Sequence, residues 1–276
     1  MNKTNNLQPT DRALIARLSR GSKGGIITVA GAASALEMPR RAAALKLIAL
    51  ARRGWLMRAR RGLYLVKPLE IGPGQRTVAE DPWVLGREAF SPCYVGGWSA
   101  AEHWGLTEQI FRSILMVSAA NLRKQKVSLL GHEFRLFKVP AFRTTGSGIS
   151  RVWRGSERVP VSNAERTLVD CLRRPELGGG IRTVADMMRE YGSPRARRFD
   201  DLLEVTEKVA TGAAWKRLGY LAEQVWPDAH EVIDAARKHV SAGNSTLDPA
   251  VKRKGTLTKR WNLWVNVTIE SAPSPS

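Results

Sequence analysis

The sequence predicts an α+β protein, in which an N-terminal winged helix-turn-helix domain is followed by a larger mixed α+β domain. The first observation is a basic run from Met38 to Lys67, with nine Lys or Arg residues and no acid. The second is that apolar residues in this run follow first a helical and then a two-stranded pattern. The third is that short strands come first and helices follow in the rest of the chain, which is typical of an α+β arrangement.

The composition is that of a globular protein with a polyanionic partner. The chain has 276 residues, an apolar fraction of 43%, a net charge of +19 and a pI near 10.7. A chain of this length and apolar fraction can bury a core, and so large a positive charge favours a polyanion. Residues 1–70 carry +11, from fourteen Lys or Arg and three Asp or Glu, so the charge is concentrated at the front of the chain.

The first forty residues contain signals for two helices and a short strand. Apolar residues recur at helical spacing from Asp11 to Ser19, and Thr10 can cap this helix. Residues 26–27 form a short apolar strand. Thr28 can then cap a helix of small residues that reaches Leu36, and small side chains allow a further helix to approach closely.

A helix and a basic hairpin complete the N-terminal pattern. The helix is expected from about Pro39, which suits a first helical turn, to Arg53, where Gly54 ends it. The apolar segments 55–57 and 63–66 flank a tight basic turn and predict a two-stranded hairpin. A helix followed by a basic hairpin is the DNA-reading end of a winged helix, so the predicted partner is double-stranded DNA.

Basic side chains of this helix and hairpin are the candidate DNA contacts. They are Arg40, Arg41, Lys46, Arg58, Arg60 and Arg61. Arg40 and Arg41 stand where a reading helix meets bases or phosphates, and Lys46 stands where it meets a phosphate. The hairpin arginines stand where a wing meets phosphates or the minor groove. Other interpretations are a disordered basic arm for the whole run, a solvated basic helix for 39–53, and a turn with ordinary surface charges for the hairpin. The two helices before this segment and the hairpin after the helix favour the winged helix.

The apolar residues of the reading helix do not define one buried face. Leu45, Leu47, Ile48 and Leu50 point to nearly all sides of the helix. The pattern therefore predicts that one apolar face is covered by DNA or by another protein.

Turn-forming residues separate the two predicted domains. The segment Pro68 to Gln75 has two prolines and two glycines in eight residues and indicates a linker. The expected division is a winged helix domain over 1–70, a linker over 71–77, a second domain over 78–270 and a disordered tail over 271–276.

The second domain is predicted to have strands first and helices later. A helix from Trp83 to Phe90 and a helix that begins at a Ser99–Glu102 capping box and ends by Gly105 come before the strands. The expected strands are 114–118, 127–129, 134–139, 149–153 and, near the C-terminus, 263–269. The expected helices are 163–173, 181–191, 198–210, 213–225 and 228–240.

No set of residues predicts a catalytic centre, a metal site or a cofactor site. Ser162 and Glu165 fit a capping box, and Arg166 and Asp170 fit an i, i+4 pair on a helix surface. The histidines are isolated, and glycine clusters lack the order of a phosphate-binding loop. The chain is therefore expected to act without enzymatic activity, metal or cofactor.

The remaining features predict a cytoplasmic protein. The two cysteines, Cys93 and Cys171, give neither a disulfide framework nor zinc spacing and indicate a reducing compartment. The N-terminus has no apolar region of a signal peptide, and no stretch approaches eighteen apolar residues, so no membrane partner is expected.

Five segments in order resemble the AbiEi-type antitoxins of abortive-infection toxin–antitoxin pairs. They are Ala51–Val66, Gly97–Gln109, Val159–Ile181, Trp215–Glu223 and Leu247–Val267. The resemblance implies an N-terminal winged helix, a C-terminal antitoxin domain and a role in phage defence. It implies repression of the protein's own operon through promoter repeats, and action against a nucleotidyltransferase-like toxin.

The same resemblance implies DNA contact by Arg58, Arg60 and Arg61, and by Arg40 and Arg41. For the toxin it implies a domain but no residues.

Two other functions remain open at the level of the sequence. A DNA-processing enzyme, such as a nuclease with a basic recognition domain, would need clustered acids to hold a metal. A ligand-sensing winged helix regulator would bind a small molecule in the second domain.

Overall fold

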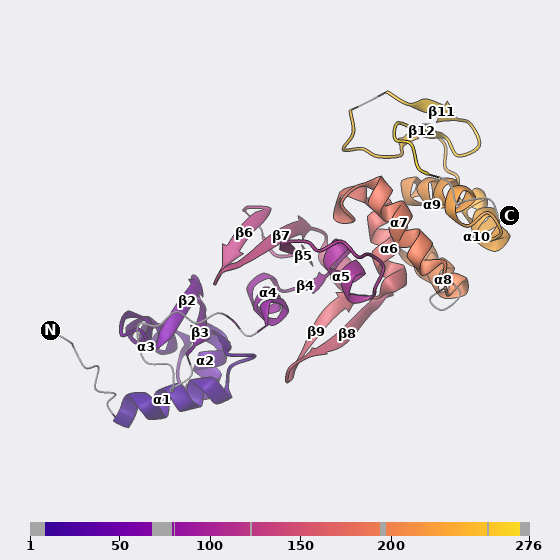
Figure 1. Ribbon diagram of the computed structural model, residues 1–276. Helices are drawn as coiled ribbons and strands as arrows, with labels where there is room; N and C mark the ends of the chain where they lie inside the picture. The colour runs from indigo at the N-terminus through magenta and orange to yellow at the C-terminus, as the bar shows by residue number, and fades with distance from the viewer. Residues whose placement is uncertain are drawn as a thin grey trace.

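The computed structural model describes residues 9–67, 79, 81–121, 123–193, 197–252 and 254–270. The predicted linker, given as Pro68 to Gln75 and as 71–77, lies outside the described residues, as does the predicted tail 271–276. Figure 1 shows an elongated molecule with an N-terminal α+β unit at one end, a mixed sheet in the middle and helices at the other end. The predicted α+β class is confirmed.

The N-terminal unit has the predicted winged helix architecture. Its elements are α1 (Pro9–Arg20), β1 (Ile26–Thr28), α2 (Val29–Leu36), α3 (Arg40–Arg52), β2 (Leu56–Arg60) and β3 (Leu63–Val66). The strands form an antiparallel sheet in the order β1-β3-β2. The hydroxyl of Thr28 caps α2 by accepting a hydrogen bond from the Gly31 N–H, at 3.0 Å. Helix α1 begins at Pro9, so Thr10 lies inside its first turn and does not precede it.

One hydrophobic core holds these helices against one face of the small sheet. It includes Leu18 of α1, Leu36 of α2, Leu47 and Leu50 of α3, and Tyr64 of β3, all of them buried. Because these residues come from the three helices and the hairpin, the core fixes the position of α3 relative to the wing.

A six-stranded mixed sheet forms the middle of the molecule. Its strands are β4 (Cys93–Val95), β5 (Ser113–Ser118), β6 (Lys126–Leu129), β7 (His132–Lys138), β8 (Ile149–Arg154) and β9 (Glu157–Ser162), in the order β6-β7-β5-β4-β9-β8. The pairs β5–β7 and β4–β9 are parallel and the others are antiparallel. Strands β4 and β9 were not predicted, because β4 has only three residues and Pro160 interrupts the pattern of β9.

Successive side chains of the central sheet enter different cores. Met116 of β5 packs in a cluster with α4 (Pro82–Phe90), whereas its neighbours Leu115 and Val117 pack with α5 (Gly97–His103) and α6 (Ala164–Arg173). This alternation follows from the two-residue period of a strand. The sheet is therefore covered on both faces.

The winged helix unit packs on the same side of the sheet as α4. Ile26, Leu63 and Leu65 of the small sheet share a hydrophobic cluster with Val84 of α4 and Phe134 of β7. The small sheet is thus buried on both faces, one against its own helices and the other against the second region.

Helix α5 begins differently from the prediction. It starts at Gly97, whose φ of 51° and close approach to Leu177 O exclude a Cβ. Ser99 lies inside the helix, and its hydroxyl accepts a hydrogen bond from the Leu115 N–H at 2.9 Å. The predicted Ser99–Glu102 capping box is therefore wrong, because this hydroxyl ties α5 to β5 instead.

Helices and a small sheet complete the C-terminal end. They are α7 (Ile181–Tyr191), α8 (Phe199–Val209), α9 (Gly212–Val225), α10 (His230–Lys238), β10 (Ser245–Thr246), β11 (Thr256–Thr258) and β12 (Leu263–Val265), with two 3-10 turns earlier, Ala141–Thr144 and Pro175–Leu177. The ring of Trp261 is fully buried against Gly219 of α9, where an added Cβ would lie 2.1 Å from the ring. The predicted strand 263–269 is shorter than expected, because it ends at Val265.

Within the ranges given above, no helix combines the length and the apolar character needed to cross a membrane.

Candidate nucleic-acid interface

Helix α3 presents a basic outer surface. Ala43, Leu47 and Leu50 face the core, and Arg40, Arg41 and Lys46 are exposed. No ion pair links these three side chains to any residue that the structure describes. The predicted helix therefore presents all three predicted side chains to solvent.

The start of α3 is electrostatically suited to an anion. Arg40 and Arg41 lie in the first turn, and this turn contains no acid. A helix N-terminus carries a partial positive charge, so two arginines here are unfavourable unless an anion lies nearby. Free N–H groups and two guanidinium groups together can bind a phosphate oxygen or a guanine edge.

The wing forms a tight turn with Arg58, Arg60 and Arg61 near its tip. Gly62 has a φ of 80°, which favours glycine, and its carbonyl accepts a hydrogen bond from the Val29 N–H at 3.2 Å. The register of β2 against β3 shifts between Arg58 and Arg60. Such a shift is a β-bulge, which bends a strand locally near the turn.

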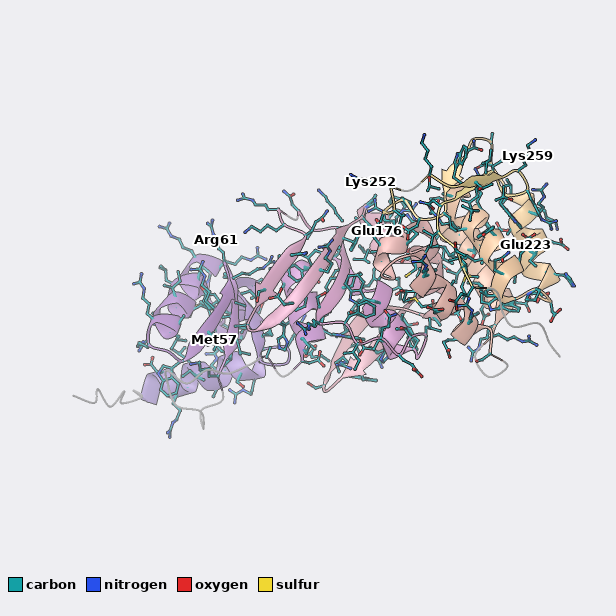
Figure 2. All side chains as sticks on the ribbon, turned by 45° about the horizontal axis from the view of Figure 1, so that its top comes forward. Met57, Arg61, Glu176, Glu223, Lys252 and Lys259 are labelled. Atoms are coloured by element: carbon teal, nitrogen blue, oxygen red, sulfur yellow. The ribbon has the colours of Figure 1, made fainter. Side chains whose placement is uncertain are left out.

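The three wing arginines have different environments. The guanidinium of Arg60 lies 5.6 Å from the ring centroid of Phe90 in α4, and burial lowers the pKa of Arg60. Arg58 donates a long hydrogen bond of 3.4 Å from Nε to the Arg60 carbonyl. Arg61 is exposed at the winged helix end of the molecule, whereas Lys252 and Lys259 lie in the C-terminal region (Figure 2). All three arginines are exposed, and Arg60 differs from the other two in its contact with Phe90.

The acids of the winged helix unit pair with basic residues that are not candidate DNA contacts. Within residues 9–67 the acids are Asp11 and Glu37. Asp11 pairs with Arg53, and Glu37 pairs with Arg17 at 2.9 Å. Both partners lie outside the predicted set of DNA contacts, so the positive charge of that set is not neutralised by these acids.

Two apolar side chains also lie on the outer surface of α3. Leu45 is 63% exposed and Ile48 is 38% exposed. The sequence alone could not show which leucines of this helix are buried, and the structure separates Leu47 and Leu50 in the core from Leu45 and Ile48 outside.

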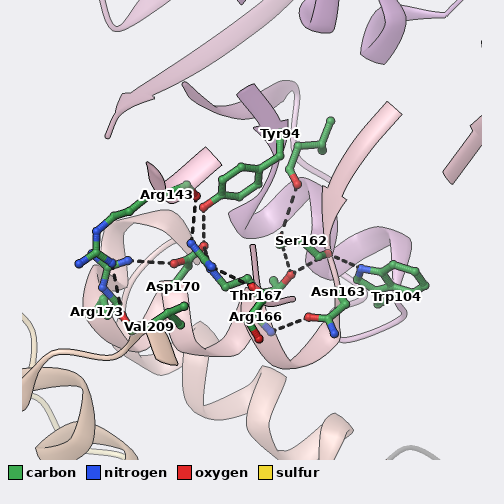
Figure 3. A network of polar contacts seen from close by, with 12 residues as sticks. Tyr94, Trp104, Arg143, Ser162, Asn163, Arg166, Thr167, Asp170, Arg173 and Val209 are labelled. Atoms are coloured by element: carbon green, nitrogen blue, oxygen red, sulfur yellow. Dashed lines mark hydrogen bonds and ion pairs between the residues drawn. The ribbon is translucent and has the colours of Figure 1, made fainter. Parts of the chain in front are cut away.

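Arg166 and Asp170 of α6 belong to a buried polar network in the second region (Figure 3). Arg166 donates to Asp170 Oδ2 at 3.0 Å and to the carbonyls of Ser147 and Arg143. The hydroxyl of Tyr94 donates to the same Asp170 oxygen at 2.6 Å, and burial next to this carboxylate raises the pKa of Tyr94. The network ties α6 to the sheet and to the loop before β8.

This network corrects two predictions. Arg166 and Asp170 do form the i, i+4 pair, but it is buried, with side-chain exposures of 1% and 3%, and does not lie on the helix surface. The predicted Ser162–Glu165 capping box is wrong, because Asn163 caps α6 by accepting from the Arg166 N–H at 2.9 Å.

Ser162 and Glu165 have other contacts. Ser162 Oγ hydrogen-bonds Thr167 Oγ1 at 2.7 Å, and Glu165 accepts from the Tyr191 hydroxyl at 3.1 Å. These contacts explain both residues as part of the scaffold of α6.

The described residues contain no group of three or more His, Cys, Asp or Glu side chains arranged to hold a metal ion. Cys93 and Cys171 are buried, and burial raises the pKa of the Cys93 thiol to about 12.

Comparisons with known proteins identify the N-terminal unit. Residues 14–67 match the family of transcriptional regulators described as AbiEi antitoxins, so the predicted resemblance is confirmed for this segment. The chain is also similar to the crystal structure of the RV2827C protein from Mycobacterium tuberculosis, with a TM-score of 0.57 and 16% identity over 94% of this chain and 92% of that chain. At this identity the similarity concerns the fold. None of the curated proteins matches the chain.

Proposed function

We propose that this protein is the antitoxin of a toxin–antitoxin pair, represses its own operon by binding promoter repeats, and counteracts a nucleotidyltransferase-like toxin. The observation that carries the DNA-binding part is the acid-free surface of α3 and the wing, which is exposed in a unit of the AbiEi regulator type. Autorepression and action against a toxin come from the family resemblance.

In this proposal the exposed basic side chains contact different parts of the DNA. Arg40 and Arg41 meet base edges or phosphates where the start of α3 enters the major groove. Lys46, Arg58 and Arg61 meet phosphates, which supplies affinity independent of sequence. Arg60 contributes less to DNA binding than its neighbours, because its guanidinium already lies over Phe90.

The proposed division of the chain follows the sequence. Residues 1–70 bind DNA, residues 71–77 connect the two parts, residues 78–270 counteract the toxin, and residues 271–276 form a tail. Support comes from the family match, which ends at residue 67. We further propose that the protein acts by binding, without a catalytic centre or cofactor, in the cytoplasm where promoter DNA lies. No toxin-facing residues are proposed.

The test combines DNA binding with protection of cells. A fluorescent duplex from the protein's own promoter is titrated with the full chain at several salt concentrations, with and without Mg²⁺. We expect salt-dependent binding and an intact duplex. Co-expression with the product of a neighbouring nucleotidyltransferase-like gene should restore growth. Absence of salt-dependent binding would contradict the DNA-binding part. Cleavage of the duplex in Mg²⁺ would contradict the proposal that the protein acts without a catalytic centre, and failure to restore growth would contradict the antitoxin part.

A further inference from the structure

The exposed apolar residues of α3 form a stripe with basic ends. Arg41, Leu45, Ile48 and Arg52 occupy positions i, i+4, i+7 and i+11, so they lie on one face of the helix. All four are exposed, with Leu45 at 63% and Ile48 at 38%. We call these four residues the α3 stripe. It lies opposite the buried side chains of Ala43, Leu47 and Leu50.

An isolated exposed leucine needs no explanation, but two adjacent apolar side chains at the centre of a reading helix do. In the proposed DNA complex this face of α3 is the one that faces the floor of the major groove. The floor is polar except at thymine, whose 5-methyl group is apolar. Leu45 and Ile48 would leave polar base edges without hydrogen-bond partners, whereas they can bury a methyl group favourably.

The charges around the stripe favour DNA over a second copy of the chain. Arg41 and Arg52 end the stripe, Lys46 is exposed beside Leu45, and α3 contains no acid. Two copies that met through this face would bring these positive charges together, which is unfavourable. A polyanion that also offers apolar groups matches both the charge and the stripe.

We propose that Leu45 and Ile48 recognise the 5-methyl groups of thymines in the major groove, so that the preferred site has A·T pairs beneath the middle of α3. This inference rests on the proposed DNA binding and specifies the sequence class that the reading helix prefers. Arg41 and Arg52 then hold the flanking bases or phosphates.

The experiment changes the DNA by methyl groups alone. A preferred duplex is first selected from randomised sequences with the full chain, and each thymine is then replaced in turn by deoxyuridine. Loss of one buried methyl should weaken binding by about fourfold at one or two thymines and leave the others unchanged. The combined variant Leu45→Ala, Ile48→Ala should bind the thymine and deoxyuridine duplexes equally. Alanine at exposed helical positions preserves the helix, so this variant should remain folded.

The matched control is Ile110→Ala, which removes an apolar side chain that is 87% exposed in the second region. It should keep the full sensitivity to deoxyuridine. Sequence-selective binding by the wild type with no sensitivity to deoxyuridine at any thymine would overturn the assignment of Leu45 and Ile48 but leave the proposed function intact. Failure to enrich any duplex would instead count against the proposed DNA binding. Self-association of the wild type that the alanine variant abolishes would show that a second copy covers the stripe, and would also overturn the assignment.

Discussion

The guanidinium of Arg60 lies over the ring of Phe90, with its central carbon 5.6 Å from the ring centroid. Phe90 is buried and also meets Phe134 edge to face, at 5.3 Å between centroids. A residue of the wing is thereby attached to the aromatic cluster between α4 and the central sheet. Arg60 and the next residue, Arg61, are both exposed, and it is the guanidinium of Arg60 that is engaged with the ring. Two adjacent arginines of the wing therefore differ in how freely they can reach a ligand.

This difference predicts different effects of the two single substitutions. Arg61→Ala should reduce the salt dependence of DNA binding by about one phosphate contact, because it removes one accessible cation. Arg60→Ala should reduce it less, and should lower the free energy of unfolding by about 0.5 kcal/mol through loss of the contact with Phe90. Binding isotherms at several salt concentrations and urea unfolding of each variant make the comparison.

The combined replacement of Arg58, Arg60 and Arg61 by alanine measures how much the wing arginines together contribute to DNA affinity. Affinity should fall for all sequences, and the salt slope should flatten by at most about three contacts. An unchanged slope in the folded triple variant would show that the wing does not touch phosphates.

The start of α3 should control sequence preference. Arg40→Ala or Arg41→Ala should reduce the discrimination between promoter and random duplexes by about 1–3 kcal/mol, since a bidentate base contact contributes that much. The control is Arg20→Ala, an exposed arginine in the last turn of α1, where an arginine is favourable for local reasons. Equal losses on both duplexes in both variants would identify Arg40 and Arg41 as phosphate contacts.

The buried network around Asp170 should govern stability and leave DNA recognition unchanged. Asp170→Asn leaves the charge of Arg166 without its carboxylate partner at an exposure of 1%, so the free energy of unfolding should fall by about 3–5 kcal/mol. Glu176→Gln is the matched control, because Glu176 and Arg174 form an exposed pair at 3.8 Å that should contribute less than about 1 kcal/mol.

Urea unfolding gives both free energies, and DNA titration at a temperature where Asp170→Asn is folded should give wild-type affinity. A similar loss of stability in both variants would contradict the role assigned to the buried pair.

Local sequence signals were sufficient for the elements whose contacts are local. The helix from Pro39, the hairpin and the Thr28 cap depend on neighbouring residues, and each appears in the structure. The two predicted capping boxes were wrong because the serine hydroxyls make other contacts in the folded chain. The Ser-x-x-Glu pattern occurs at both Ser99 and Ser162, but their hydroxyls bond instead to a neighbouring strand and to Thr167.

The candidate interface could be predicted only in part. The residue types in α3 and the wing indicated DNA, but which apolar side chains of α3 face solvent depends on the packing of the helix against α1 and α2. The contact of Arg60 with Phe90 joins residues thirty positions apart in different parts of the fold, so no local pattern could reveal it.

The two proposed activities should separate at the linker, although the two parts share apolar surface. Residues 1–70 should bind promoter DNA weakly and fail to protect cells from the toxin, and residues 76–276 should protect cells without binding DNA. Separation exposes Ile26, Leu63 and Leu65, which are buried against α4 and the central sheet in the whole chain, so the small fragment should be markedly less stable there than in the intact protein. Mixing the fragments should therefore restore part of the lost DNA affinity.

Gel shifts of each fragment and of the mixture, beside growth assays with co-expressed toxin, measure both activities. Rescue by residues 1–70 alone, or loss of rescue by a folded 76–276 fragment, would show that the toxin-facing surface involves the winged helix. Loss of rescue by the folded 76–276 fragment would place this surface at the boundary of the two parts, which contact each other through the shared cluster. A charged substitution such as Leu65→Glu in the full chain would then impair protection as well as DNA binding, whereas under the proposed division it should impair DNA binding more than protection.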